Sequence, residues 1–393
     1  MIRPSPSPQH FKSRSTRSPW RWAWRGAAVV VGVVVLLVGT SVVGAVTTPG
    51  NTSFTAKWAD WLRAHHAATV ADQLEQWYYD AKAPAPGGRP ARLNAIPPAD
   101  PPSSSVASPL DPNLGPPAPV PLVVVPGLPG EGQWHGTGPV IGGSPAMYVA
   151  QFRADTVYTS QITAAVWMDP HRLRIRLVPG AQEPGGSWAQ PPDLSGTAEA
   201  QAVAAFNGGF RFQDARGGFY LDGRTAVALR PGAASVVIHS DGTTDIGTWD
   251  QEVAMTPTVE AVLQNLVPLV DGGVVAPAAQ SDNERIWGFT LGATTIVARS
   301  GIGITATGAL VYVAGPALSV RTLAEALQRA GAVRAMALDI NPEWVTFNIY
   351  DHPNPSDPTQ VSAIKLYPQM ARPATRYLGP TRESRDFFTV SQA

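Results

Sequence analysis

Residues 27–46 carry no charged side chain, and this apolar run of 20 positions limits what the N-terminal part of the chain can form. At about 1.5 Å per residue, a helix of this length spans a hydrocarbon core of roughly 30 Å. The arm before it, residues 1–26, is basic, contains no acidic side chain and ends in three tryptophans, Trp20, Trp22 and Trp24. Basic residues favour the cytoplasmic side and indole rings favour the membrane interface. The sequence therefore predicts a single-pass membrane anchor with a cytoplasmic N-terminus and an extracytoplasmic C-terminal part.

A cleaved signal peptide is the alternative interpretation of the same run. Val43, Gly44 and Ala45 would fit a cleavage site. The apolar region of a signal peptide is usually only about 7 to 15 residues long, which favours the uncleaved anchor.

Overall charge and cysteine content exclude some function classes. The 29 basic and 29 acidic side chains balance, so no general affinity for nucleic acid follows. The chain has no cysteine, which excludes disulfides and thiol chemistry. At 393 residues it can bury a sizeable core.

Two further segments separate the apolar run from the globular part. Residues 47–82 contain apolar side chains at steps of three and four, which predicts an amphipathic helix over about 54–79. Its tryptophan-rich stripe would lie on the membrane, bind a partner or pack on the protein itself. Residues 83–121 are about one-third proline and predict a semi-extended spacer.

Residues 122–393 form the predicted domain, and their pattern is rich in strands. We expect an α+β fold with a predominantly β mixed sheet and few helices, outside the cytoplasm. The clearest helix covers about 320–330, with Ser319 as a cap and Gly331 as the stop. It should connect the strand beginning at Leu310 to a neighbouring strand that ends near Asp339. The tail after Pro353 has no clear pattern and is expected to be irregular.

The stretch 335–349 predicts two strands joined by a turn, because apolar side chains alternate on both sides of Asn341 and Pro342. Asp339 ends the first strand on a face that otherwise carries alanines, which would leave room for a ligand. Glu343 lies four residues further on. The two carboxylates face one site or point apart, and the sequence leaves both arrangements open.

Two other loops combine glycine with a hydrogen-bonding group after a strand. Asn207, Gly208 and Gly209 offer a side-chain amide and backbone N–H groups that can turn toward a ligand. Arg299 offers a planar cation for a phosphate or carboxylate. Each has an ordinary alternative, since Asn-Gly-Gly is often a turn and a single arginine often pairs at the surface.

The order of these motifs resembles the phosphodiester glycosidase family. The residues that carry the resemblance are AFNGGF at 205–210, GFYLDG at 218–223, ARSGIGI at 298–304, TLAEAL at 322–327 and ALD at 337–339. The resemblance implies hydrolysis of a sugar-1-phosphodiester. It also implies that Asn207, Arg299 and Asp339 line the cleft and that Gly208 and Gly209 shape its wall.

The chain departs from the family after Asp339. The family has a run of glycines there, whereas this chain has Ile340, Asn341, Pro342, Glu343 and Trp344. Proline lacks an N–H, and isoleucine and tryptophan are bulky. Either the site is rebuilt, with Glu343 as a new carboxylate and Trp344 as a platform for stacking on a sugar, or catalysis is lost.

These observations predict a membrane-anchored, extracytoplasmic hydrolase of glycosyl phosphodiesters or related cell-envelope glycans. Asp339 and Glu343 are the expected catalytic residues, while Asn207, Gly208, Gly209, Arg299 and Trp344 would bind the substrate. The alternative is an inactive glycan-binding module of the same fold. Two carboxylates also allow a divalent cation, although no His, Cys and Asp cluster has the spacing of a metal site.

Overall fold

The computed structural model describes residues 19–47, scattered residues between 54 and 70, and most of residues 84–393. Within the last part, the residues left out are 91, 97, 100–113, 116, 282, 288–295, 353–356, 358–359 and 381–383. The chain divides into two compact units, Met1–Ala71 and Asp72–Ala393.

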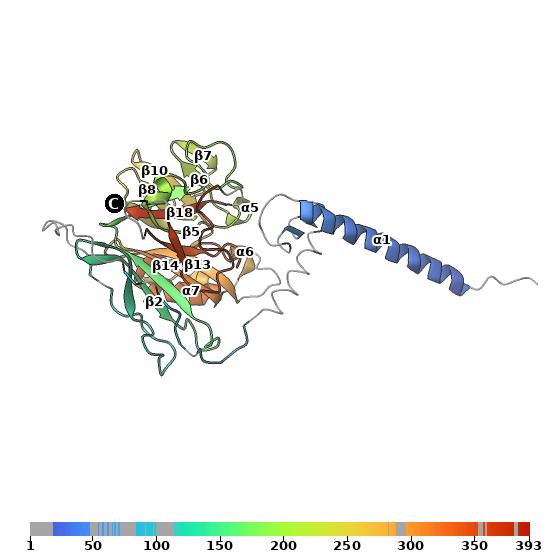
Figure 1. Ribbon diagram of the computed structural model, residues 1–393, viewed down its shortest axis with the longest axis horizontal. Coiled ribbons are helices and arrows are strands. Elements are labelled where there is room, and N and C mark those ends of the chain that lie inside the picture. Colours follow the sequence, from blue (N-terminus) through green and yellow to red (C-terminus); the bar gives the residue numbers. More distant parts are fainter. Residues whose placement is uncertain are drawn as a thin grey trace, which may run out of the picture. The chain divides into compact units, whose positions relative to one another are not determined.

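The first unit contains one long helix, α1 (Pro19–Thr47), which includes the whole uncharged run (Figure 1). Among the residues that the structure describes, no helix is both long and apolar enough to cross a membrane. The predicted amphipathic helix over 54–79 falls mostly outside the described residues.

The second unit is built from β-sheets with few helices, which confirms the predicted α+β class for this domain (Figure 1). The largest sheet has eight strands in the order β1-β2-β3-β14-β13-β15-β11-β12. Its strands are β1 (Trp134–Ile141), β2 (Ser144–Phe152), β3 (Thr163–Met168), β11 (Pro268–Asp271), β12 (Val274–Val275), β13 (Val297–Thr305), β14 (Leu310–Leu318) and β15 (Ala332–Ala337).

Two five-stranded sheets complete the domain. The first has the order β17-β16-β5-β18-β4, and the second has the order β7-β6-β10-β8-β9. The first contains β4 (Leu173–Val178), β5 (Ala202–Asn207), β16 (Phe347–Asp351), β17 (Ser362–Lys365) and β18 (Phe387–Gln392). The second contains β6 (Phe219–Leu221), β7 (Arg224–Val227), β8 (Ala234–His239), β9 (Thr244–Thr248) and β10 (Val259–Gln264). Short helical turns lie between the strands: α4 (Thr197–Gln201), α5 (Phe212–Ala215), η1 (Pro277–Gln280) and α6 (Glu284–Trp287).

Helix α7 (Val320–Arg329) forms where its sequence predicts it. Ser319 caps it by accepting from the Thr322 N–H, and Gly331 has a φ of +99°, which favours glycine. The sequence predicted that the strand beginning at Leu310 neighbours the strand before Asp339, and this prediction was wrong. Strand β13 pairs antiparallel with both β14 and β15 and lies between them, so the crossover through α7 skips one strand.

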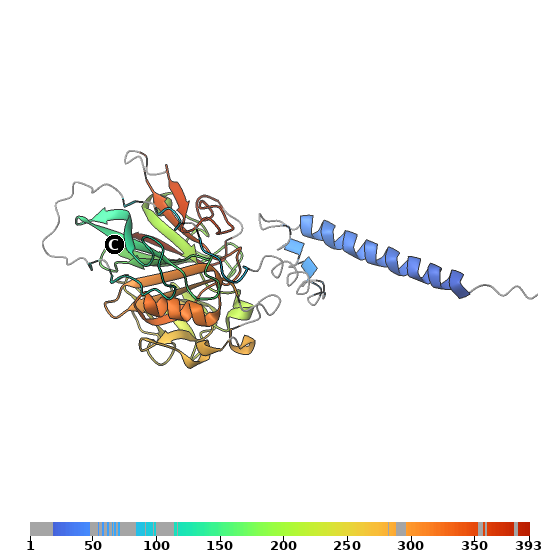
Figure 2. The same ribbon diagram turned by 90° about the horizontal axis from the view of Figure 1, so that it is seen from below.

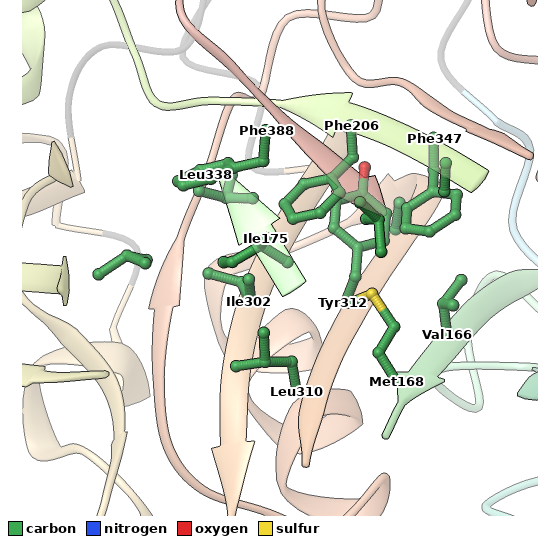
Figure 3. Packing of buried hydrophobic residues seen from close by; sticks show 14 of the residues in the cluster. Val166, Met168, Ile175, Phe206, Ile302, Leu310, Tyr312, Leu338, Phe347 and Phe388 are labelled. Atoms are coloured by element: carbon green, nitrogen blue, oxygen red, sulfur yellow. The ribbon is translucent and has the colours of Figure 1, made fainter. Parts of the chain in front are cut away.

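The main hydrophobic core collects buried side chains from all three sheets. Phe206 of β5 belongs to this core, and its ring centroid lies 5.2 Å from that of Tyr312 on β14 (Figure 3). The rings of Phe347 and Phe388 stack on Phe206 at 5.5 and 5.1 Å. This aromatic cluster joins the two sheets directly beneath the end of β5.

The C-terminal tail is not irregular, which corrects the sequence prediction. β18 pairs with both β5 and β4 and is therefore a central strand of its sheet. Its signal is the short run Phe387–Val390, which is buried on both faces and so lacks the alternation of a half-buried strand.

The described parts of the proline-rich segment lie along the domain. The Asn94 N–H donates to the Gln151 side chain at 2.8 Å, and the Val120 N–H donates to the Gly132 carbonyl at 2.8 Å. Val120 is buried. These contacts tie residues on both sides of 100–113 to the domain.

Candidate functional site

The Asn207 side chain is buried at the end of β5, between the first residues of β16 and β18. Its Oδ1 accepts from the Thr346 N–H and from the Tyr312 hydroxyl, both at 3.0 Å. Its Nδ2 donates to the Gly208 carbonyl at 2.8 Å and to the Ser300 hydroxyl at 3.0 Å. The amide is therefore fully used within the protein, and Asn207 organises the site rather than offering a free amide to a substrate.

Ser300 joins the Asn207 loop to the Asp339 loop. Its N–H and its hydroxyl both donate to the Asp339 carbonyl oxygen, at 3.0 and 2.9 Å. Two motifs that are 132 residues apart in the sequence, at Asn207 and Asp339, thus meet through one serine on β13. The sequence prediction did not single out this serine.

The Asp339 carboxylate is buried and receives two donors. Its Oδ1 accepts from the Asn341 N–H at 2.8 Å, which closes the turn after the strand. Its Oδ2 accepts from the guanidinium of Arg385 in a buried ion pair. Arg385 lies in the tail that was expected to be irregular, and the sequence prediction missed it.

The alanines on the strand before Asp339 do not leave room for a ligand, contrary to the sequence interpretation. Ala335 and Ala337 pack in one cluster with Leu323 and Leu327 of α7. Figure 2 shows α7, the orange helix, running along the sheet. Small side chains on this face allow the helix to approach closely.

Glu343 and Asp339 bind different arginines. Glu343 Oε2 lies 3.1 Å from Arg372 Nε, and the Glu343 side chain is 24% exposed. The two carboxylates belong to one arginine cluster, however, because both arginines also lie over the Trp344 ring.

Trp344 is 7% exposed and is covered by cations. The distances from the ring centroid to the guanidinium carbons are 6.0 Å for Arg372, 4.3 Å for Arg376 and 4.0 Å for Arg385. Cation–π contacts of this kind hold the indole in place. A sugar could stack on this ring only after displacing a guanidinium group.

Arg299 is also buried, and its Nε donates to the Leu318 carbonyl at 2.8 Å. Neighbouring residues of a strand point to opposite faces. Arg299 therefore shares the sheet face of Gly301, which packs against α7, and not the face on which Ser300 meets Asn207.

Asp386 is a second buried carboxyl beside the glycine loop, and the sequence prediction missed it. Its carbonyl oxygen accepts from the Gly208 N–H at 3.1 Å, and its Oδ2 accepts from the Gly209 N–H at 3.3 Å. Burial raises the pKa of Asp386 to about 7, against the opposing effect of the Arg385 charge.

Asn265 borders the same loop. Its Nδ2 donates to the Ala337 carbonyl at 2.9 Å, and its Cβ and Cγ would lie 3.3 Å from a Cβ placed on Gly209. A buried asparagine at the end of a strand is often only structural, so no clear sequence signal marked this residue.

Within the described part of the chain, no group of three or more His, Cys, Asp or Glu side chains could hold a metal ion. Asp339 and Glu343, the two carboxylates that the sequence suggested for a cation, are each paired with an arginine.

Residues 200–339 match the family model described as phosphodiester glycosidase. No curated protein matches the chain. Among solved structures, the catalytic domain of zebrafish N-acetylglucosamine-1-phosphodiester alpha-N-acetylglucosaminidase, auto-inhibited by its pro-peptide, is similar over 64% of this chain and 84% of that chain, with 16% identity and a TM-score of 0.40. A hypothetical protein from Synechocystis is similar over 64% of this chain and 63% of that chain, with 13% identity and a TM-score of 0.36.

The family match begins just before Asn207 and ends at Asp339, so it covers both loops that Ser300 connects. The resemblance inferred from the sequence motifs is confirmed: residues 200–339 of this chain match the model of the phosphodiester glycosidase family.

Proposed function

We propose that this protein hydrolyses glycosyl phosphodiesters or related cell-envelope glycans outside the cytoplasm. The observation that carries the proposal is the network of Asn207, Ser300 and Asp339, which lies within the family-matched residues 200–339. In the proposed reaction, water adds to the anomeric carbon and the bond from that carbon to the phosphate oxygen breaks. The products are a free sugar and a phosphate monoester.

Charge near Asp339 suits an anionic substrate. Three guanidinium groups lie around Trp344, at Arg372, Arg376 and Arg385, against the two carboxylates of Asp339 and Glu343. Arginine is well matched to phosphate, because its planar donors can bind two oxygens. We assign the phosphate to this arginine cluster and to the wall formed by Gly208 and Gly209, with Arg299 supporting the sheet behind them.

Asp339 is the proposed catalytic carboxylate. It would accept a proton from the attacking water or stabilise positive charge that develops on the sugar ring. Glu343 is the sequence-based choice for the proton donor, and its ion pair with Arg372 would have to open for that role.

The test uses the full chain and follows release of sugar from N-acetylglucosamine 1-(methyl phosphate) and from aryl glycosides, with and without a chelator. Asp339→Asn should lower kcat by about 100-fold or more, because the variant keeps the shape but not the charge. Asp351→Asn, at the exposed end of β16, is the matched control and should retain activity. Equal activity of Asp339→Asn and the wild type, in folded protein, would refute the assignment.

The second candidate function is a glycan-binding module without catalysis. It is favoured by the burial of Asp339 and Trp344 and by Pro342 in place of a family glycine. This alternative predicts saturable binding of envelope glycan by the wild type, with no sugar released from any substrate of the panel.

We further propose that residues 27–46 anchor the chain in a membrane and place the domain outside the cytoplasm. The support is the uncharged sequence, its position within α1, and exposed apolar side chains such as Leu36 at 66%. The full chain should stay in the membrane pellet after alkaline carbonate washing. Release by the wash, or a mature N-terminus after residue 45, would contradict the anchor.

A further inference from the structure

Asp386 lies directly against the glycine loop of the site. Its backbone precedes β18, whose first residue, Phe387, pairs with Asn207. A Cβ placed on Gly208 would lie 1.9 Å from Asp386 Oδ2, so only glycine leaves space for this carboxyl group. The absence of a side chain at position 208 is therefore explained by Asp386.

One oxygen of this carboxyl group is not used by the protein. Oδ2 accepts from the Gly209 N–H, whereas Oδ1 is buried and has no hydrogen-bond partner among the described residues. A buried polar atom without a partner costs free energy, and such atoms are concentrated at functional sites. Oδ1 therefore has the capacity to bond a substrate atom.

Asn265 provides a second oxygen of this kind on the other side of the loop. Its Oδ1 is buried without a partner among the described residues, and it lies 3.6 Å from a Cβ placed on Gly209. The side chains that carry these two unused oxygens, Asp386 and Asn265, both border the glycine loop. Both oxygens can accept a hydrogen bond from a ligand that carries hydroxyl or other polar groups.

The charges around Asp386 differ from those around Asp339. Asp339 accepts from two donors, the Arg385 guanidinium and the Asn341 N–H, and both contacts suit a charged carboxylate. Arg385, Glu183 and Tyr377 are the titratable groups that interact with Asp386. Burial raises the pKa of Asp386 to about 7 and the charge of Glu183 acts in the same direction, so a large fraction is protonated near neutral pH. Two carboxyl groups with opposite protonation preferences can divide the roles of base and acid.

We infer that Asp386, rather than Glu343, is the proton donor of the site. This inference rests on the proposed function. The Asp386 O–H gives its proton to the phosphate oxygen of the leaving group as the bond to the anomeric carbon breaks, and the bonding electrons stay on that oxygen. The attacking water supplies the new hydroxyl group of the sugar and loses its second proton to Asp339. Asp386 then regains a proton from solvent, and Asp339 releases its proton to solvent.

The test compares two N-acetyl-α-glucosaminides on the full chain. The phenyl glycoside needs protonation of its leaving oxygen, whereas the 2,4-dinitrophenyl glycoside does not. Asp386→Asn keeps an acceptor for the Gly209 N–H but cannot supply the proton. It should lower kcat/KM about 100-fold or more for the phenyl glycoside and less than about tenfold for the dinitrophenyl glycoside. It should also abolish the alkaline limb of the pH profile near pH 7.

Glu343→Gln is the matched control at the competing carboxyl group and should affect both substrates equally. A leaving-group-dependent loss in Glu343→Gln, or a uniform loss in Asp386→Asn, would overturn the assignment while the hydrolase proposal stands. If the wild type cleaves neither these glycosides nor the phosphodiester, the hydrolase proposal fails and the proton donor fails with it.

Discussion

The Asp339 carboxylate accepts a hydrogen bond from the Arg385 guanidinium, although 46 residues separate them in the sequence. Both side chains are almost fully buried, with 4% and 6% of their surface exposed. Arg385 lies outside the family-matched region 200–339. The C-terminal segment is therefore part of the site and not an appendage to it.

Arg385→Ala should destabilise the domain strongly, because it leaves a buried carboxylate without its cation. We expect a loss of about 3 to 5 kcal/mol in the free energy of unfolding, measured by urea denaturation. Arg321→Ala is the control, since Arg321 pairs with Glu325 at the surface, where the two side chains are 58% and 35% exposed. That change should cost less than about 0.5 kcal/mol. Similar losses in both variants would contradict the buried pair.

Asn207→Ala should unfold more readily than the wild type, because four neighbours lose a buried hydrogen-bond partner: Thr346, Tyr312, Ser300 and Gly208. We expect a loss of roughly 3 kcal/mol, measured by thermal or chemical unfolding. A loss of activity in this variant would then report a disordered site rather than a missing catalytic group. A variant with wild-type stability would show that the network contributes little.

Gly208→Ala should be much more disruptive than Gly209→Ala. A Cβ at position 208 would meet Asp386 Oδ2 at 1.9 Å, whereas a Cβ at position 209 would meet Asn265 at 3.3 Å. We expect Gly208→Ala to cost about 3 kcal/mol or more and Gly209→Ala about 1 kcal/mol, compared in one denaturation series. The reverse order would argue against the position of the Asp386 side chain.

Asp386 should make stability depend on pH between about 4 and 7. Its pKa in the folded chain is about 7, above its ordinary value of 3.8, so the folded state holds the proton more tightly. The stability that comes from this proton is complete below pH 4 and is lost as the pH rises through 7. Relative to the wild type, Asp386→Asn should gain on the order of 2–3 kcal/mol of stability between pH 5 and pH 8. A constant difference between the two proteins across this range, measured by urea denaturation, would contradict the raised pKa.

Local patterns predicted the elements that depend on neighbours in the sequence. The capped helix α7 begins at Val320, where Ser319 predicts its start, and the alternating residues before Asp339 form β15. The glycine loop after Val203–Phe206 was also identified correctly as the end of a strand. The central strand β18 was missed because both of its faces are buried, which removes the alternation that identifies a strand.

Three features follow from the sequence alone. They are a strand-rich domain, an uncharged apolar run at residues 27–46, and a family resemblance based on Asn207 and Asp339. The surroundings of those residues depend on the tertiary structure. It joined Asp339 to Arg385, placed Asp386 against Gly208, covered Trp344 with guanidinium groups and filled the alanine face with α7. The physical reason is that the periodicity of apolar residues indicates which residues are buried. The partner of a buried charge depends instead on which distant strands pair.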